Sequence, residues 1–237
     1  MTISVIIPAY NEVKTIEKVI RTVTAVALPD DVIMDLIVID DASDDGTAEI
    51  VENLQISDFP RPITILKHTQ NQGKGAALHT GIAAATGDYI LIQDADLEYD
   101  PRDYHQLLNP VLENNADVVY GSRFIGGHPH RVLFFWHSIG NKFLTMLCNA
   151  FCNLNLTDME SCYKLIRREL LQGLNLREKR FGFEPEVTIK MSRIPDIKIY
   201  EVGISYHGRT YTEGKKIGWR DGFRAIWVIF STGLRKG

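Results

Sequence analysis

The alternation of short β-branched runs with segments of helical spacing constrains the fold of this chain more than any other feature. A helical pattern separates each run from the next, and helices are the usual crossovers between parallel strands. We therefore expect an α/β fold with a mostly parallel sheet covered by helices on both faces. The strand-like runs are ISVII at 3–7, DLIVID at 35–40, ITILKH at 63–68, DYILIQ at 88–93 and DVVYG at 117–121.

The second half of the chain has a different pattern. Residues 132–154 have helical spacing but are apolar around most of the helix, which suits packing against the sheet, a partner subunit or a membrane surface. A strand-like run at 196–206, a polar loop at 207–216 and a helical segment at 219–234 follow. Because no linker or low-complexity stretch separates these segments from the first half, we expect residues 1–237 to form a single domain.

Composition excludes several classes of protein. At 237 residues and 45% apolar content, the chain can bury one substantial core. Its net charge is -4 with acidic and basic residues mixed, and no basic stripe with interleaved aromatics occurs, so we expect no nucleic-acid partner. No apolar run reaches the roughly 20 residues of a membrane-spanning helix, and Met1 leads directly into a strand-like run. These features predict a cytoplasmic protein, soluble or peripheral at the inner face of the membrane.

One strand-like run ends in a cluster of carboxylates, in the sequence ILIQDADLEYDP. Asp94 and Asp96 are two residues apart, so in an extended segment their side chains point the same way. The repulsion between them is unfavourable unless a cation or hydrogen-bond donors are present. We therefore predict a divalent metal ion at Asp94 and Asp96, with Glu98 close to it.

Polar groups follow the other predicted strands as well, at the edge where open α/β sheets bind their ligands. We expect the glycines of the segment NQGKG to allow a close backbone approach and Lys74 to reach an anion. The alternatives are structural, since Asp41 can cap the helix that begins near Gly46 and Arg123 can pair with one of the carboxylates. The residues at these strand ends are Tyr10, Glu12, Asp40, Asp41, Lys74 and Arg123.

Six motifs in this chain carry a family resemblance. They are VIIPAYNE, VIDDASDDGT, NQGKGAALHTGIAAATGDYILIQDADLE, DVVYGSRF, TDMESCYKLIRRE and FGFEPEVTIKM. In this order they resemble family 2 glycosyltransferases with the GT-A fold, and among them the branch of dolichyl-phosphate mannose and glucose synthases and their bacterial relatives. The resemblance covers residues 3 to about 225. It implies a single mixed, mostly parallel sheet flanked by helices, with a nucleotide-binding half at 1–124 and an acceptor-binding half at 125–237.

The resemblance also implies a reaction. Such enzymes transfer a hexose, with inversion at the anomeric carbon, from a nucleotide-diphosphate sugar of the GDP-mannose or UDP-glucose type. The acceptor implied for this branch is a polyprenyl or dolichyl phosphate. The alternatives are a glycosyltransferase with a soluble hydroxyl acceptor, a sugar nucleotidyltransferase and a non-catalytic nucleotide-sugar binding protein. A nucleotidyltransferase usually has a Gly-rich, Arg-containing loop after the first strand, where this chain has PAYNEVKT.

Residues of this chain that match the motifs of the family are implied to bind the donor. Asp94 and Asp96 would hold Mg²⁺ or Mn²⁺ against the diphosphate, and Ala95 would let the ribose lie close. Glu98 stands where the mannosyl branch usually has Gln, which adds a negative charge near the metal. Asp41 would bond to the base. The residues that would hold the nucleoside are Pro8, Tyr10, Glu12, Ile39 and Asp41.

The resemblance implies catalytic groups that act on the charges that develop during the reaction. Arg123, Arg209 and Lys215 would contact the phosphates, the last two from a loop that closes over the donor. Together with Asp96 and its metal, Arg209 and Lys215 would stabilise the charge on the departing diphosphate. A hydroxyl acceptor would need a general base, for which Asp158 in TDMES is the candidate. A lipid phosphate is already ionised, and Asp158 would then orient the acceptor or the sugar.

The apolar segment 132–154 suggests two partners besides the substrates. It can form the interface of a homodimer, or it can lie on a surface of anionic lipid. The choice bears on the acceptor, because a polyprenyl phosphate is accessible only to a protein at the bilayer surface.

Overall fold

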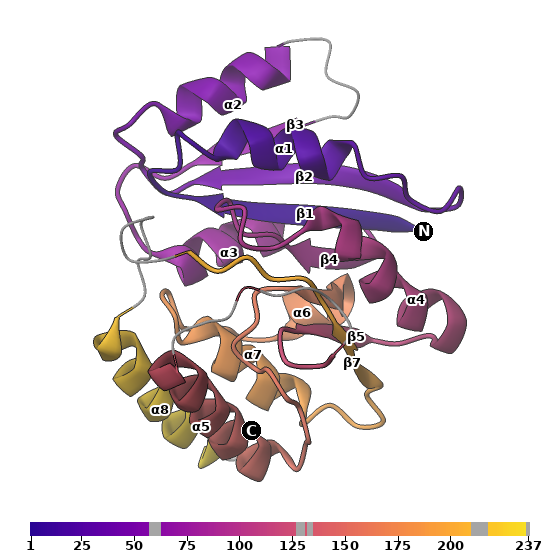
Figure 1. Cartoon of the computed structure of the whole chain (residues 1–237), viewed down its shortest axis with the longest axis vertical. Helices are drawn as coiled ribbons and strands as arrows, with labels where there is room; N and C mark the ends of the chain where they lie inside the picture. The colour runs from indigo at the N-terminus through magenta and orange to yellow at the C-terminus, as the bar shows by residue number, and fades with distance from the viewer. Residues whose placement is uncertain (57–62, 127–130, 132–134, 210–217, 236–237) are drawn as a thin grey trace.

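The computed structural model of the chain describes residues 1–56, 63–126, 131, 135–209 and 218–235. In these residues one sheet of seven strands runs in the order β3-β2-β1-β4-β6-β5-β7 (Figure 1). Both halves of the chain contribute strands to this sheet. The strands are β1 (Thr2–Ala9), β2 (Ile33–Asp40), β3 (Ile63–Lys67), β4 (Tyr89–Ile92), β5 (Val118–Ser122), β6 (Lys164–Arg167) and β7 (Ile199–Gly203).

Strand β6 makes the sheet mixed. It pairs antiparallel with β4 and β5, while every other pair of neighbouring strands is parallel. The predicted α/β fold with a mixed, mostly parallel sheet is therefore confirmed. Because β6 runs opposite to its neighbours, the residues that precede it lie near the carboxyl ends of β4 and β5. The assignment of one half of the chain to the nucleotide and the other to the acceptor stays a prediction.

Helices cover both faces of this sheet. The five residues from Ile3 to Ile7 of β1 are all buried, although successive side chains of a strand point to opposite faces. Near-continuous burial of this kind is typical of parallel strands with helices on each side. The helices are α1 (Ile16–Thr24), α2 (Thr47–Ile56), α3 (Lys74–Ala84), η1 (Pro101–Asp103), α4 (Tyr104–Asn114), α5 (Phe135–Cys152), α6 (Arg168–Gly173), α7 (Phe183–Met191) and α8 (Trp219–Gly233).

Helices α5 and α8 pack side by side at one end of the molecule, beside α7 (Figure 1). The rings of Phe151 and Phe230 meet edge to face with their centroids 5.4 Å apart. Each helix nevertheless keeps a stripe of large apolar side chains exposed, and we call the two stripes the α5–α8 surface. No helix in the described parts of the chain is long and apolar enough to cross a membrane. The α5–α8 surface consists of Phe135, Trp136, Ile139, Phe143 and Met146 on α5 and Phe223, Trp227 and Phe230 on α8.

Candidate functional site

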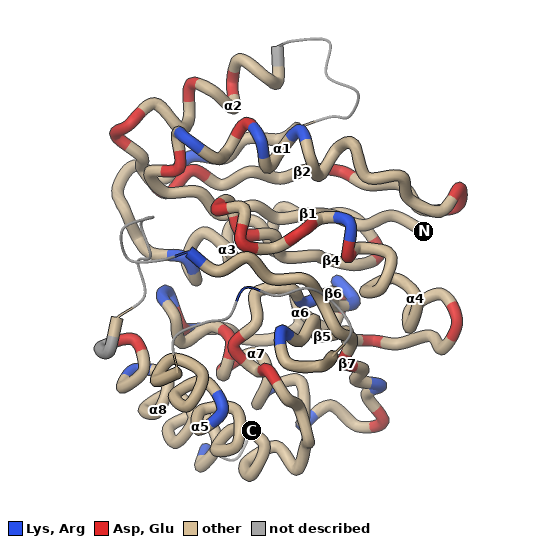
Figure 2. Tube along the Cα trace, viewed as in Figure 1, with Lys and Arg blue, Asp and Glu red and all other residues tan. Residues whose placement is uncertain are grey.

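The three carboxylates predicted to bind a metal lie on the loop after β4, at the carboxyl edge of the sheet. Figure 2 marks the acidic and basic positions along the chain trace. The carboxylate of Asp96 accepts a hydrogen bond of 3.1 Å from the backbone N–H of Glu98. Leu97 between them has a positive φ of 62°, which gives the tight turn that Asp side chains favour. Asp94, Asp96 and Glu98 therefore gather on one short turn, and we call them the acidic edge.

Lys74 at the start of α3 neutralises one end of the acidic edge. Its Nζ lies 2.8 Å from Oδ1 of Asp94 and 3.6 Å from Oε1 of Glu184 on α7. Burial would raise the pKa of Asp94, but the charge and hydrogen bond of Lys74 outweigh it, and the pKa is lowered. Lys74 thus pairs with two carboxylates of the protein, and its contact with the anion of a ligand stays a prediction.

Arg209 neutralises the other end of the acidic edge. Its guanidinium lies 2.8 Å from Oδ2 of Asp96, 3.6 Å from Oε1 of Glu98 and 3.5 Å from Oε2 of Glu12. The backbone N–H of Arg209 also donates to Oε1 of Glu98 at 2.7 Å, and the hydroxyl of Tyr206 donates to Oε2. Arg209 is thus brought to the acidic edge as predicted. Lys215 lies outside the described residues.

Asp96 remains crowded despite the guanidinium beside it. Burial, together with the charges of Asp94 and Glu98, raises the pKa of Asp96 to about 7, although Arg209 opposes this shift. Burial is the main cause of this raised pKa, and the two neighbouring carboxylates add to it. Additional positive charge would relieve this repulsion.

Asp41, the predicted partner of the base, bonds to protein groups. Its carboxylate accepts hydrogen bonds from the backbone N–H of Gln72 at 2.9 Å and of Gly73 at 2.7 Å. His68 Nδ1 lies 2.6 Å from Oδ1. These bonds fasten the loop before α3 to the end of β2. Asp45, rather than Asp41, bonds to the backbone at the start of α2 through the N–H of Thr47, so the alternative in which Asp41 itself caps this helix does not hold.

The glycines of NQGKG approach another part of the protein. A Cβ on Gly75 would lie 2.3 Å from the backbone oxygen of Glu178, and one on Gly73 would lie 2.7 Å from that of Lys179. The backbone N–H of Ala76 donates to Lys179 at 3.0 Å. The close backbone approach predicted from these glycines is therefore made to the segment before α7. It fixes the position of Lys74 between Asp94 and α7.

Arg123 and Asp158 form a buried ion pair beside the acidic edge. Two nitrogens of the guanidinium contact the carboxylate at 2.6 and 2.8 Å, and the backbone N–H of Arg123 adds a bond of 3.0 Å. Asn141 on α5 donates a fourth bond at 2.9 Å. Burial would raise the pKa of Asp158, but Arg123 and these donors lower it. A carboxylate so engaged is a weak proton acceptor, so the geometry favours the orienting role of Asp158 over the base role.

The other residues predicted to contact the nucleoside lie at the ends of β1 and β2. Pro8 and Ile39 are register partners on these strands. Ile39 is fully buried, with its Cδ1 against Gly81 of α3, so it supports the site from the core rather than lining it. Tyr10 is 39% exposed and can contact a ligand. Ala95 is buried on the acidic edge between its two aspartates.

A second group of polar residues escaped the sequence analysis. Glu160 and Ser161 precede β6, and Glu184 begins α7 next to Lys74. Each has a buried side-chain oxygen without a hydrogen-bond partner, namely Oε1 of Glu160, Oγ of Ser161 and Oε2 of Glu184. We call these three residues the Glu184 cluster. The available signal was the pair of glutamates in FGFEPEV, which interrupts an otherwise apolar helical pattern.

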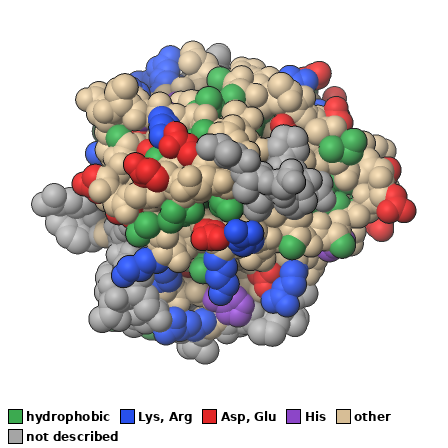
Figure 3. All heavy atoms as spheres, turned by 90° about the horizontal axis from the view of Figure 1, so that it is seen from above, with side chains coloured by type: hydrophobic (Ala, Val, Ile, Leu, Met, Phe, Trp, Pro, Cys, Tyr) green, Lys and Arg blue, Asp and Glu red, His purple; other side chains and the backbone are tan. Residues whose placement is uncertain are grey.

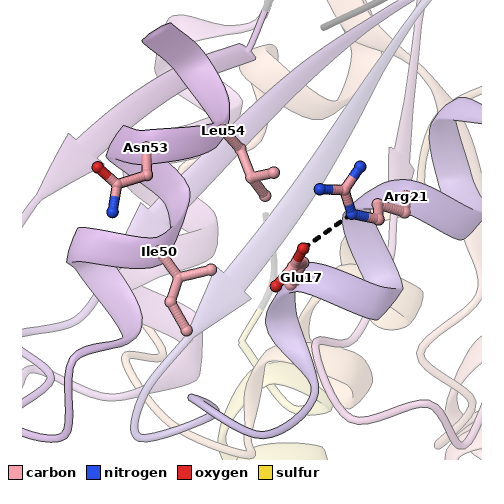
Figure 4. A pocket seen from close by; sticks show the side chains of 5 residues that line it. All are labelled: Glu17, Arg21, Ile50, Asn53 and Leu54. Atoms are coloured by element: carbon pink, nitrogen blue, oxygen red, sulfur yellow. Dashed lines mark hydrogen bonds and ion pairs between the residues drawn. The ribbon is translucent and has the colours of Figure 1, made fainter. Parts of the chain in front are cut away.

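A surface pocket between α1 and α2 lacks the crowded carboxylates of the acidic edge (Figure 4). It is lined by Glu17 and Arg21 of α1 and by Ile50, Asn53 and Leu54 of α2. Its only charged groups, Glu17 and Arg21, pair with each other at 2.9 Å. On the face of the molecule in Figure 3, Asp and Glu side chains likewise lie among Lys and Arg side chains. The acidic edge, with its uncompensated charge, is the stronger candidate for a ligand site.

Comparisons with known proteins agree with this reading. Residues 4–174 match the family model described as glycosyl transferase family 2. The chain is 27% identical over 221 residues to a dolichol-phosphate mannosyltransferase of Pyrococcus furiosus, and 31% identical over 224 residues to a low-salt glycan biosynthesis hexosyltransferase of Haloferax volcanii. Each alignment covers 92% of this chain, but only 61% and 52% of those two proteins.

A further relative and a solved structure match most of their own length. The chain is 28% identical over 230 residues to an undecaprenyl-phosphate mannosyltransferase of Micrococcus luteus, covering 92% of this chain and 88% of that protein. The fold resembles glucosyl-3-phosphoglycerate synthase of Mycobacterium tuberculosis, solved with Mn²⁺, UDP and phosphoglyceric acid, with a TM-score of 0.75 and 23% identity. That likeness covers 100% of this chain and 80% of the other, and it supports the predicted GT-A fold.

Proposed function

The chain belongs to glycosyl transferase family 2, and from this premise we propose that it transfers a hexosyl group from a nucleotide-diphosphate sugar to an acceptor. The observation that carries the proposal is the acidic edge, where Asp94, Asp96 and Glu98 meet Lys74 and Arg209 at the carboxyl ends of parallel strands. Carboxylates beside two cations suit a ligand that combines a metal ion with a diphosphate.

The acidic edge fits a divalent metal ion. Carboxylate oxygens are hard ligands of the kind that Mg²⁺ and Mn²⁺ prefer, and added positive charge would relieve the repulsion that raises the pKa of Asp96. No group of three or more carboxylate, histidine or cysteine side chains within the described ranges is arranged to hold a metal by itself. Asp94 and Asp96 would therefore hold the ion together with diphosphate oxygens. Structures of the glucosyl-3-phosphoglycerate synthase contain UDP with Mn²⁺ or Mg²⁺, which agrees with this arrangement.

Arg209 and Lys74 have distinct roles in this proposal. When bound, the metal neutralises charge on the diphosphate. Arg209 pairs with three carboxylates of the acidic edge and its surroundings, and it is close enough to transfer its hydrogen bonds to the phosphates of a donor. Its charge would then stabilise the departing diphosphate. Lys74 holds Asp94 ionised and in place, so that this carboxylate keeps its negative charge for the metal.

For the acceptor, we favour a polyprenyl phosphate. A phosphate oxygen is already ionised and needs no base, which agrees with Asp158 being bonded to Arg123 and Asn141. Relatives named for dolichol phosphate and undecaprenyl phosphate support this class of acceptor. The α5–α8 surface supports it as well, because exposed aromatic stripes of this kind bind the interfacial region of a bilayer. The protein would then be peripheral to the membrane.

The acceptor can be tested with labelled donors. Radiolabelled UDP-glucose and GDP-mannose are incubated with the protein, Mn²⁺ and vesicles that contain undecaprenyl phosphate, and label in the lipid fraction is measured. We expect transfer from one donor by the wild-type protein and by Glu113→Gln, which alters an exposed carboxylate on α4. Label that is released as free sugar, or transferred only to 3-phosphoglycerate, would reject the lipid acceptor in favour of water or a soluble hydroxyl.

Membrane contact has its own test. Trp136 is 78% exposed on α5, so Trp136→Glu is expected to reduce flotation with vesicles of anionic lipid without reducing stability. If the wild-type protein does not float at low salt, and Trp136→Glu instead converts a dimer into a monomer, then the α5–α8 surface is a subunit interface.

A further inference from the structure

The Glu184 cluster contains buried oxygens that the fold itself does not use. Ser161 is fully buried, Glu184 is 5% exposed, and the Oγ and Oε2 atoms of these residues have no hydrogen-bond partner. Oε1 of Glu160 is also buried and has no hydrogen-bond partner. Leaving a buried polar atom unpaired costs roughly 1–3 kcal/mol, and more for a charged group. Three such atoms contributed by neighbouring elements point to a ligand that donates hydrogen bonds.

The cluster lies directly beside the acidic edge. Lys74 connects the two, since its Nζ contacts Asp94 at 2.8 Å and Glu184 at 3.6 Å. Cys162, the residue after Ser161, donates its backbone N–H to the hydroxyl of Tyr99 on the loop of the acidic edge at 3.0 Å. The antiparallel direction of β6 brings residues 160–162 to this edge. A group attached to a diphosphate at Asp94 and Asp96 would therefore lie within reach of the cluster.

The charges of the cluster restrict what it can bind. Burial and the charge of Glu184 raise the pKa of Glu160 to about 8, in spite of Lys164 nearby. The carboxylate of Glu184 repels a phosphate, and the carboxyl group of Glu160 offers no positive charge to offset this repulsion. The cation Lys74 already occupies the space between Asp94 and Glu184, and no three-residue metal site occurs in the described parts of the chain. Neutral hydroxyl groups remain as the complementary ligand, because they donate hydrogen bonds without adding charge.

We propose that Glu160, Ser161 and Glu184 bind the hydroxyl groups of the hexosyl unit of the donor and so select its sugar. The inference rests on the proposed function, because it takes the hexose to be attached to a diphosphate at the acidic edge. A site that uses buried acceptors for hydroxyl groups strongly disfavours a sugar that lacks a matching hydroxyl, since the acceptor is then left unpaired. The Glu184 cluster thus selects the sugar, while residues outside the cluster bind the nucleoside and the diphosphate.

Calorimetric titration separates these two parts of the donor. UDP, UDP-glucose, GDP and GDP-mannose are titrated, in the presence of Mn²⁺, into the wild-type protein, Glu184→Gln, Ser161→Ala and the control Glu169→Gln. Glu169 lies exposed on α6, outside the cluster. For the nucleotide that the wild-type protein binds, we expect the Kd of the nucleoside diphosphate to change by less than about twofold in each variant. The Kd of its sugar form should increase about 10- to 100-fold in Glu184→Gln, as for loss of a hydrogen bond to a charged group, and about 2- to 10-fold in Ser161→Ala, whose hydroxyl is neutral.

Three other outcomes would overturn the inference. An equal change in the Kd of nucleoside diphosphate and nucleotide sugar would show that the cluster supports the whole site rather than the sugar. Unchanged Kd values for both would show that it does not contact the donor. If the wild-type protein binds neither UDP nor GDP, the proposed function itself fails. Thermal unfolding of each variant checks the fold, and a loss of stability with unchanged relative affinities would indicate a structural role.

Discussion

The two ends of the sheet carry carboxylates in different surroundings. At the amino end of β5, Asp117 pairs with Arg167 at 2.9 Å and accepts a hydrogen bond from the backbone of Lys198 at 3.0 Å. One carboxylate there has one cation and one donor. At the carboxyl end of β4, Asp94, Asp96 and Glu98 share two cations, and the pKa of Asp96 is raised to about 7. The charge of Asp117 is thus offset by one cation, whereas three carboxylates share two cations at the acidic edge.

This difference separates a structural ion pair from the proposed binding site. Asp117 joins three segments of chain, and its partners are complete without a ligand. The acidic edge keeps an excess of buried negative charge, which is unfavourable for folding and persists only where function requires it. Substitutions at the two ends should therefore act on different properties: stability at the amino end of β5 and ligand binding at the carboxyl end of β4.

The largest effect is expected for Asp96→Asn. The substitution removes a proposed metal ligand and should lower the rate of hexosyl transfer by roughly 10³-fold, the scale of losing one preorganised electrostatic contact. Because it also relieves repulsion with Asp94 and Glu98, the free energy of unfolding should stay the same or rise. Transfer assays and urea unfolding of the same preparation measure both. A variant that loses stability as well as activity would assign Asp96 a structural role.

Asp158→Asn should act mainly on stability. The change leaves the buried guanidinium of Arg123 without its counter-ion, which should cost about 3 kcal/mol of unfolding free energy. Residual activity decides between the two roles of Asp158. If it orients the acceptor or the sugar, the pH dependence of kcat/KM keeps its shape in the variant. If Asp158 is a base, the variant loses the acidic limb of that profile.

Lys74→Met should have a smaller effect on stability, about 2 kcal/mol, because its side chain is 19% exposed and Asp94 keeps some access to water. The affinity for Mn²⁺ with a nucleoside diphosphate should fall, because Asp94 loses the cation that keeps it ionised and in place. The bound ligands should still restore part of the lost stability, since a metal can replace the missing charge. Urea unfolding with and without Mn²⁺ and UDP measures this. Failure of the ligands to restore stability would show that Lys74 does not share its carboxylate with a metal.

The smallest effect is expected at the balanced end of the sheet. Asp117→Asn weakens a partly exposed ion pair and should cost about 1 kcal/mol of unfolding free energy with hexosyl transfer unchanged. This variant is the matched control for Asp96→Asn. A loss of activity comparable to that of Asp96→Asn would break the distinction between the two ends of the sheet.

The sequence predicted the parallel part of the fold and the loop of the acidic edge, because both depend on local patterns. Strands β1 to β4 follow β-branched runs, and Asp94 and Asp96 follow one of these directly. The position of β6 was beyond such reasoning. Its four residues contain Lys164 and Arg167, and only tertiary pairing with β4 and β5 makes them a strand.

The partners of the site residues depended on the same long-range arrangement. Glu184 reaches Lys74 only because the backbone at Gly73 and Gly75 packs against the segment before α7. Arg123 and Asp158 are 35 residues apart in the chain, and their ion pair favours the second of the two roles predicted for Asp158, an orienting group rather than a base. The residue types indicated which side chains could bind ligands or transfer protons. They did not indicate which of these side chains form ion pairs with other residues of the protein.

The central claim is that the acidic edge binds a nucleoside diphosphate through a divalent metal, and calorimetry tests it most directly. UDP and GDP are each titrated into the wild-type protein, once with Mn²⁺ and once with a chelator. Because Asp94, Asp96 and Glu98 repel a diphosphate unless a cation intervenes, we predict that one of the two nucleotides binds with Mn²⁺ at least about tenfold more tightly than with the chelator. Equal affinity under the two conditions would contradict the account.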